Sequence, residues 1–211
     1  MSELIVLTTS PGGKRERAKL HNRRVILDAA REVFGELGYE AASVRDIIRR
    51  TGLSVGSFYN YYRSKEEVYA ALASDGATRF APILKAQFDA ATDFESYLRG
   101  AISAYFCFMV SQQGAWRAQR PEGESYPPPV RADTPELEAV YDQVRWSIAE
   151  ALTRERSPPV DIEYLAAACI AVAREIGEKM LDRRPIKTAE AVEFTVHMIL
   201  GGLRGLPPLT A

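Results

Sequence analysis

The chain has 211 residues and a formal net charge of -1; 46% of its residues are hydrophobic and 26% are charged. This composition is ordinary for a soluble globular protein, the length suffices for one large or two small domains, and no apolar run approaches the ~18 residues of a membrane span. The amino terminus does not resemble a secretory signal, so we expect a cytoplasmic protein.

The charge is unevenly distributed along the chain. Residues 1–65 contain 12 Lys or Arg and 7 Asp or Glu, a net charge of +5, whereas residues 66–211 contain 15 and 21, a net charge of -6. A basic segment followed by an acidic one suggests that the basic segment meets a polyanion. The alternative is a solvated basic tail, because residues 14–24 supply much of the excess.

Residues of the types that can bind metals are scattered along the sequence. Cys107 and Cys169 are isolated in apolar surroundings, and His21 and His197 have no partners at ligand spacing. Disulfide frameworks and zinc sites need clustered ligands, so we expect two small buried thiols and no metal or cofactor.

The first 68 residues predict a basic leader and a three-helix unit. Residues 1–21 are expected to form a flexible leader, and residues 22–68 the helical unit. Apolar stripes at helical spacing predict helices at 26–37 and 44–51, followed by a short helix from Ser54. Gly38 and Gly52 are expected to end the first two helices.

Residues 69–211 predict a second, larger helical domain. A helix begins at Ser64, which has capping-box spacing to Glu67, and Pro82 is expected to kink or end it. A similar box at 92–95 opens a helix over 93–113. Further helices are expected from about Thr134, with Pro135 at the first position, and at the ranges 161–184 and 188–204. A Pro-rich loop is expected at 120–132. The fold class is therefore all-α, with about nine helices if residues 114–120 form a short one.

The short third helix is unusually aromatic. At about 100° per residue, Phe58 and Tyr62 share the core face, while Tyr59 and Tyr61 flank it. The outward face is small and polar: it consists of Gly56, Ser57 and Asn60. Such a face suits the major groove, where Ser and Asn can bond base edges and flanking tyrosines can reach phosphates. The second and third helices then form a helix-turn-helix, although an ordinary helical hairpin is the alternative.

Residues 22–72 closely resemble the DNA-binding domain of the TetR/AcrR family of bacterial transcriptional regulators. The matching segments are "ILDAAREVFGELGYEAASVRDI" and "TGLSVGSFYNYYRSKEEV". The resemblance implies DNA contacts at Arg45, Val55, Gly56, Ser57, Tyr59, Asn60, Tyr61 and Lys65. Two positions depart from the family pattern: Val55 stands where many relatives carry a polar or basic residue, and Tyr61 where histidine is common.

The resemblance also implies that the carboxy-terminal domain binds a small molecule and forms a homodimer through its last two helices. The bulky residues of 93–113 and of the following helix predict a mostly apolar ligand site at Tyr97, Tyr105, Phe108, Met109, Tyr141 and Trp146, although aromatic residues usually form core. The predicted dimer interface comprises Cys169, Val172, Ala173, Ile176, Val192, Thr195, Val196, Ile199 and Leu203. Packing within one subunit is the alternative for these residues.

Three functions follow for testing. The leading hypothesis is a repressor that binds a pseudo-palindromic DNA operator as a homodimer and is released by a small, mostly apolar effector. A DNA-binding regulator without a small-molecule ligand, or an activator, is the second. An enzyme is the third, but the sequence shows no catalytic triad, phosphate-binding loop or metal cluster to support it.

Overall fold

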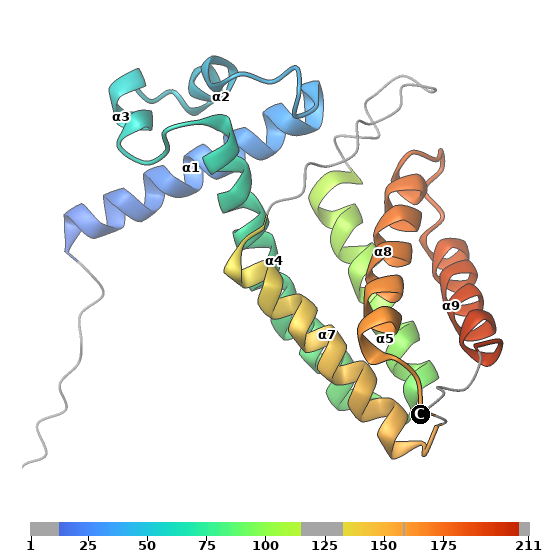
Figure 1. The fold of residues 1–211 in the computed structure, drawn as a ribbon. Helices are drawn as coiled ribbons and strands as arrows, with labels where there is room; N and C mark the ends of the chain where they lie inside the picture. The colour runs from blue at the N-terminus through green and yellow to red at the C-terminus, as the bar shows by residue number, and fades with distance from the viewer. Residues whose placement is uncertain (1–12, 115–132, 158, 207–211) are drawn as a thin grey trace, which may run out of the picture.

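A computed structural model of the protein describes residues 13–114, 133–157 and 159–206 (Figure 1). In these residues the chain forms eight α-helices and one π-helical turn, and no strand. The predicted all-α class is therefore confirmed. None of the described helices is both long and apolar enough to cross a membrane. The predicted loop at 120–132 and nearly all of the possible helix at 114–120 lie outside the described residues.

Three helices form the amino-terminal unit: α1 (Lys14–Leu37), α2 (Val44–Thr51) and α3 (Val55–Tyr59). The predicted flexible leader is wrong for residues 14–21, which are the first two turns of α1. Arg, Lys, Glu, Ala and Leu dominate this segment, and these residues favour helix even where the side chains remain exposed. Residues 1–12 lie outside the described residues.

Local hydrogen bonds set the ends of α2. Ser43 accepts the backbone N–H of Asp46, and the Asp46 carboxylate accepts the Ser43 backbone N–H in return, which completes a capping box. Gly52 ends the helix in the left-handed region, at φ 68°. Ile47, at the middle of α2, packs into the core of the unit, whose buried members are Ile26, Leu27, Ala29, Ala30, Val33, Phe34, Ala42, Ile47, Phe58, Tyr62 and Val68.

Helix α4 (Lys65–Ala90) connects this unit to the rest of the molecule without interruption (Figure 1). Pro82 lies within the helix and does not end it, and its side chain is exposed. Val68 belongs to the core of the amino-terminal unit, whereas Ala77 and Phe80 belong to a second core. The two cores are therefore separated within α4, between its second and fourth turns.

The second core fills the body, which consists of α5 (Phe94–Met109), a π-helical turn η1 (Val110–Gly114), α7 (Pro135–Arg154), α8 (Ile162–Leu181) and α9 (Thr188–Arg204). Helix α5 is central, since it contacts α4, α7, α8 and α9. Asp93 caps α5 in a reciprocal pair with Ser96, one residue later than the predicted box. Thr134 caps α7, with Pro135 at its first position as predicted.

Candidate DNA-binding surface and ligand cavity

Helix α3 separates its aromatic residues as its sequence predicts. Phe58 is fully buried and Tyr62 nearly so, which confirms their place on the core face. Val55 and Tyr59 are 58% and 52% exposed. Tyr61 is half-buried beside the core. The tyrosine ring of residue 59 packs edge-on against Phe58, so its hydroxyl lies at the rim rather than in the core.

The helix itself is shorter than the wheel assumes. It ends at Tyr59, and the carbonyl of Phe58 then accepts the N–H groups of Tyr61 at 2.9 Å and Tyr62 at 3.1 Å. This turn keeps Tyr62 on the core side beyond the helix. Arg23 of α1 donates to the Tyr62 hydroxyl at 3.2 Å, which ties the turn to α1.

The outward face of α3 is slim. Gly56 and Asn60 are exposed, and no heavy atom lies within 4 Å of the position that a Cβ on Gly56 would occupy. Ser57 is half-buried, and its hydroxyl accepts a hydrogen bond from the Ser54 hydroxyl at 3.0 Å. The predicted small, polar face therefore exists, and its contact with DNA remains a prediction.

Lys65 is a correction to the predicted DNA contacts. Its ammonium donates to the carbonyls of Tyr39 at 2.9 Å, Glu40 at 3.3 Å and Ala42 at 3.2 Å, and it lies 4.5 Å from the centre of the Tyr39 ring. An ammonium has three N–H donors, and all three are used here. Lys65 thus fastens the start of α4 to the loop between α1 and α2, and this geometry argues against the predicted phosphate contact.

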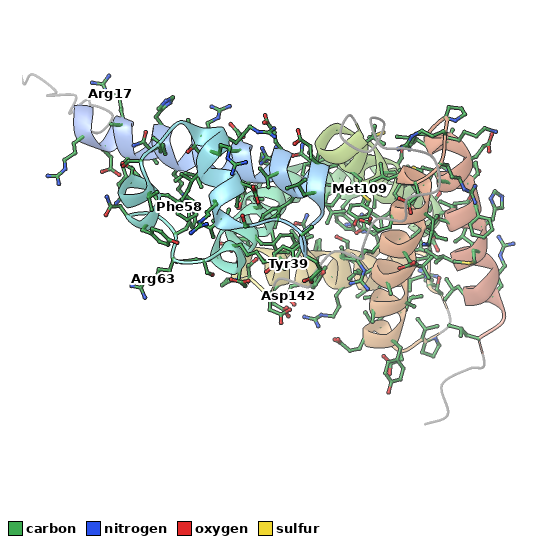
Figure 2. The ribbon with its side chains drawn as sticks, turned by 90° about the horizontal axis from the view of Figure 1, so that it is seen from above. Arg17, Tyr39, Phe58, Arg63, Met109 and Asp142 are labelled. Carbon is green, nitrogen blue, oxygen red and sulfur yellow. The ribbon has the colours of Figure 1, made fainter. Side chains whose placement is uncertain are left out.

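The arginines around α3 fall into two groups: one is bonded within the unit, and the others are exposed. Arg50 is used within the unit, because its guanidinium bonds Glu32 and Glu36 of α1; these bonds hold the pKa of Glu36 below its usual value. Arg45 is exposed, and its contact with DNA remains a prediction. Two exposed arginines were missed: the Arg49 side chain is 80% exposed, and Arg63 points away from the molecule in Figure 2. Their positions beside the helix-turn-helix could have indicated them.

The body contains a cavity of about 340 Å³ between α4, α5, α7 and α8. Its wall is mostly apolar, with Phe80, Leu84, Ile102 and Val140 among the lining residues. Five of the six predicted ligand-site residues line it: Tyr97, Tyr105, Phe108, Met109 and Tyr141. Figure 2 shows Met109 in the interior, close to α8.

Trp146 is the exception, and its prediction as a ligand contact is corrected. It is 57% exposed and packs against the ring of Phe88, at 4.9 Å between ring centres, instead of lining the cavity. On α7 it lies roughly 160° from Ile148, which does line the cavity.

The cavity has a polar end. Gln112 of η1 and Arg174 and Glu178 of α8 line it, as do the phenols of Tyr105 and Tyr141. The carboxyl-terminal ends of α5 and α8 and the start of α7 lie on the side of the body that faces α1–α3 (Figure 1). The polar end therefore lies nearest the amino-terminal unit, and Leu84 and Ile148 line the far end.

Burial determines the ionisation of three side chains in the cavity wall. It raises the pKa of Tyr97 to about 12 and that of the Cys169 thiol to about 12. Burial also raises the pKa of Tyr105, an effect that Glu178 and Tyr141 reinforce and Arg174 opposes. Ser147 partly offsets the shift of Tyr97, yet neither hydroxyl has a hydrogen-bond partner of ordinary geometry among the described residues. All three groups stay neutral at physiological pH.

The amino-terminal unit is similar to a known family of proteins. The profile described as "Bacterial regulatory proteins, tetR family" matches residues 26–72, which cover the second half of α1, all of α2 and α3, and the start of α4. This part of the chain is a TetR-family DNA-binding domain. The protein is therefore a DNA-binding transcriptional regulator with a helix-turn-helix, and α3 occupies the position of the recognition helix.

Relatives of this chain include an activator and several repressors. It is 28% identical over 205 residues to the HTH-type transcriptional activator FasR of Mycolicibacterium smegmatis, across 93% of this chain and 90% of that protein. It is 39% identical over 64 residues to the repressor AcnR of Corynebacterium glutamicum, but that match spans 30% of this chain and only 34% of AcnR. The repressor match thus concerns less than a third of this chain.

Solved structures share the whole fold. The fatty acid degradation regulator FadR from Bacillus halodurans superposes with a TM-score of 0.70 at 21% identity, over 92% of this chain and 99% of that one. FadR from Bacillus subtilis, solved in complex with stearoyl-CoA, gives 0.69 at 17% identity, over 85% and 98%. At such identities the likeness shows the fold.

A chain of polar contacts connects the cavity to α1 in this protein. Arg79 of α4 donates to the side-chain oxygen of Gln112 at 2.7 Å, and its guanidinium also pairs with Asp75 at 3.0 Å. The same Asp75 oxygen accepts a bond from Arg31 of α1 at 3.3 Å. We call these four residues the Gln112–Arg31 chain.

The predicted dimer residues contribute to the body's own core: the five that are buried are corrected as an interface, and an interface at the other four remains a prediction. Five are buried within the subunit and four pack against the same core, so the apolar stripes of α8 and α9 serve the body's own interior. The buried five are Cys169, Val192, Thr195, Val196 and Ile199, and the others are Val172, Ala173, Ile176 and Leu203. A second apolar surface lies on the opposite side, where Tyr164, Phe194 and Met198 are exposed. We call it the outer face of α8 and α9.

Proposed function

We propose that this regulator binds its operator as a homodimer in the cytoplasm and that a ligand in the body cavity controls this binding. The observation that supports a ligand is the cavity of about 340 Å³, which lies beside α4 and has an apolar wall with one polar end. Its volume is at the lower end of the range for small-molecule sites. Because α4 also carries Val68 of the amino-terminal core, a ligand there touches the helix that supports the recognition helix.

The outer face of α8 and α9 is the surface we propose for dimerisation. Tyr164 is 78% and Phe194 57% exposed, although large apolar side chains are usually withdrawn from water. Small exposed residues surround them: Ala167, Ala168 and Ala171 on α8, and Gly201 and Gly202 on α9. Two helices from each subunit could pack there as a four-helix interface. A two-fold dimer would present two recognition helices, as a pseudo-palindromic operator requires, about 34–36 Å apart.

The proposed ligand is an amphiphile with a long apolar chain, such as a fatty acyl thioester. Three facts support this class: the apolar wall, the polar end, and the stearoyl-CoA found with FadR from Bacillus subtilis, which shares the fold. A cavity of this size accommodates an acyl chain but not a coenzyme A moiety as well, so the nucleotide would lie outside.

Repression is the simpler mode, since a dimer on its operator blocks polymerase. Activation is a second candidate, favoured by one specific observation. The relative that aligns over 90% of its own length, FasR, is named an activator, whereas the match to the repressor AcnR spans only 34% of AcnR. The regulated promoter decides between them.

The test is operator binding by the purified protein, measured by fluorescence anisotropy on DNA from upstream of its own gene, with and without stearoyl-CoA. We expect selective binding that stearoyl-CoA changes by tenfold or more, about 1.4 kcal/mol of coupling. Binding to this DNA no tighter than to random DNA would refute the proposed operator. Operator affinity that stays unchanged when acyl-CoA is bound would refute ligand control.

Tyr59 and Asn60 should have different effects on DNA binding. Tyr59→Phe removes an exposed hydroxyl at the rim of α3, so we expect a loss of about 0.5–1.5 kcal/mol, equal on all sequences, because phosphate contacts carry little sequence information. Asn60→Ala should change base preference instead. Binding to a library of operator variants distinguishes the two; a sequence-selective loss in Tyr59→Phe would contradict the assignment.

Gly177→Ala should reduce ligand affinity. A Cβ on Gly177 would lie 2.5 Å from the Met109 sulfur, and Met109 lines the cavity. The flexible Met109 side chain must therefore move away from residue 177. We expect about a tenfold loss in acyl-CoA affinity and a stability cost of about 1–3 kcal/mol. Gly76→Ala is the matched control, since it adds the same methyl group to the cavity wall with no heavy atom within 4 Å. Equal ligand affinity in both variants would show that Met109 does not move into the cavity.

A further inference from the structure

The polar end of the cavity carries a cationic side chain, Arg174. Arg174 lines this end, is only partly exposed, and forms no ion pair with a described residue. Glu178, one turn further along α8, lines the same end with the opposite charge, but it already has a partner within the protein. A partly buried guanidinium without a carboxylate costs free energy that an incoming anion can recover.

Neutral hydrogen-bond donors surround this guanidinium. Tyr105 lies close enough for Arg174 to lower the pKa of its phenol, against the larger effect of burial. Because burial prevails, Tyr105 stays protonated and can donate to an oxygen anion. Gln112 contributes its side-chain amide, whose oxygen is already used by Arg79, so the N–H group remains the available end. It also donates to Ser111 at 3.2 Å, which leaves one amide proton.

The rest of the cavity excludes charge. Leu84, Leu98 and Ile148 line the far end, and the hydroxyl of Tyr97, which also lines the cavity, is held neutral by burial. An anionic group at that end would be desolvated without a partner. The two ends thus fix one orientation for an amphiphilic ligand.

We propose that the end of the cavity nearest the amino-terminal unit is an anion subsite, in which Arg174, assisted by Gln112 and Tyr105, binds the negatively charged head group of the ligand. This assignment rests on the proposed ligand-controlled function and adds the charge and direction of the ligand. The head group lies beside Gln112, the first member of the Gln112–Arg31 chain, and the apolar tail points towards Ile148. The anion is the carboxylate of a free fatty acid or a phosphate group of an acyl-CoA.

The test compares charged and neutral ligands that share one tail. Stearic acid, methyl stearate and stearoyl-CoA compete for the full-length protein against a fluorescent fatty acid. We expect the wild type to bind at least one of the two anionic ligands about tenfold more tightly than methyl stearate. Arg174→Gln should reduce this preference to within about twofold while it leaves methyl stearate binding unchanged, and Arg174→Lys should restore part of it. Lys179→Gln is the control, because Lys179 is exposed on α8 outside the cavity wall.

Each outcome decides a different point. Loss of preference for stearic acid in Arg174→Gln assigns the subsite to a carboxylate, and loss for stearoyl-CoA alone assigns it to the thioester's phosphates. An equal loss for all three ligands would make Arg174 a structural residue and overturn the subsite. If the wild type binds neither the acids nor the ester, the proposed ligand class fails first, and the subsite fails with it.

Discussion

Gly56→Glu should abolish operator binding and leave the fold intact. Gly56 lies on the outward face of α3, and the space around its missing side chain is empty, so the new side chain meets no protein atom. Replacing a helical glycine gains up to about 1 kcal/mol of helix propensity, and a carboxylate near a helix amino terminus is favourable. Against DNA, the same side chain fills the groove-facing surface and repels phosphates. We expect at least a hundredfold loss of affinity, about 2.7 kcal/mol.

Anisotropy on the operator and thermal unfolding, measured together, separate the two effects. Gly56→Ala should be intermediate, since a methyl group is small and uncharged. Ala86→Glu adds the same charge to an exposed position of α4 in the body, so its operator affinity should remain near that of the wild type. Full operator binding by Gly56→Glu would mean that another surface meets the DNA.

Arg79→Met should separate ligand binding from its effect on DNA. Arg79 is the central member of the Gln112–Arg31 chain, bonded to Gln112 on one side and Asp75 on the other. Its side chain is 42% exposed, so loss of these pairs should cost at most about 1 kcal/mol of stability. If the chain transmits ligand occupancy to α1, the ligand-induced change in operator affinity should fall by about five- to tenfold, while each affinity measured alone changes by less than about threefold.

The matched control is Lys85→Met. Lys85 also lies on α4 and pairs with a carboxylate one turn away, Asp89 at 2.5 Å, but neither residue lines the cavity. Its removal should leave the ligand response at the wild-type value. A full ligand response in Arg79→Met would exclude this chain as the route and point to the apolar packing along α4.

The amino-terminal unit was predictable because its signals are local. Helical spacing and glycine positions placed α2 and α3, and the wheel correctly buried Phe58 and Tyr62. The prediction of a flexible leader was wrong because residues 14–21 form a helix by intrinsic helix propensity, without an apolar stripe in the sequence that would indicate it. Lys65 was misplaced for a different reason: the three carbonyls that it binds are 23 to 26 residues away in the sequence, and no local pattern reveals them.

The body was less predictable because it is determined by contacts between helices distant in sequence. The aromatic spacing on α5 identified four cavity residues, yet Trp146 on α7 could be excluded only once Ile148 was known to face inward. Helices α8 and α9 each carry two apolar faces. The stronger stripe suggested an interface, whereas the structure uses it for the core and exposes Phe194 and Met198 instead.

The unbroken course of α4 through Pro82 has a mechanical consequence. From Leu84 at the far end of the cavity to Lys65 beside the helix-turn-helix, 19 residues at about 1.5 Å each form a stiff lever about 28 Å long. Tilting such a lever by about 5° displaces its DNA end by about 2.5 Å, and in a two-fold dimer the two displacements add to about 5 Å. Recognition helices spaced for one turn of DNA, about 34–36 Å, would then miss consecutive major grooves by more than a hydrogen bond's length. A proline that broke the helix would absorb this tilt as a hinge.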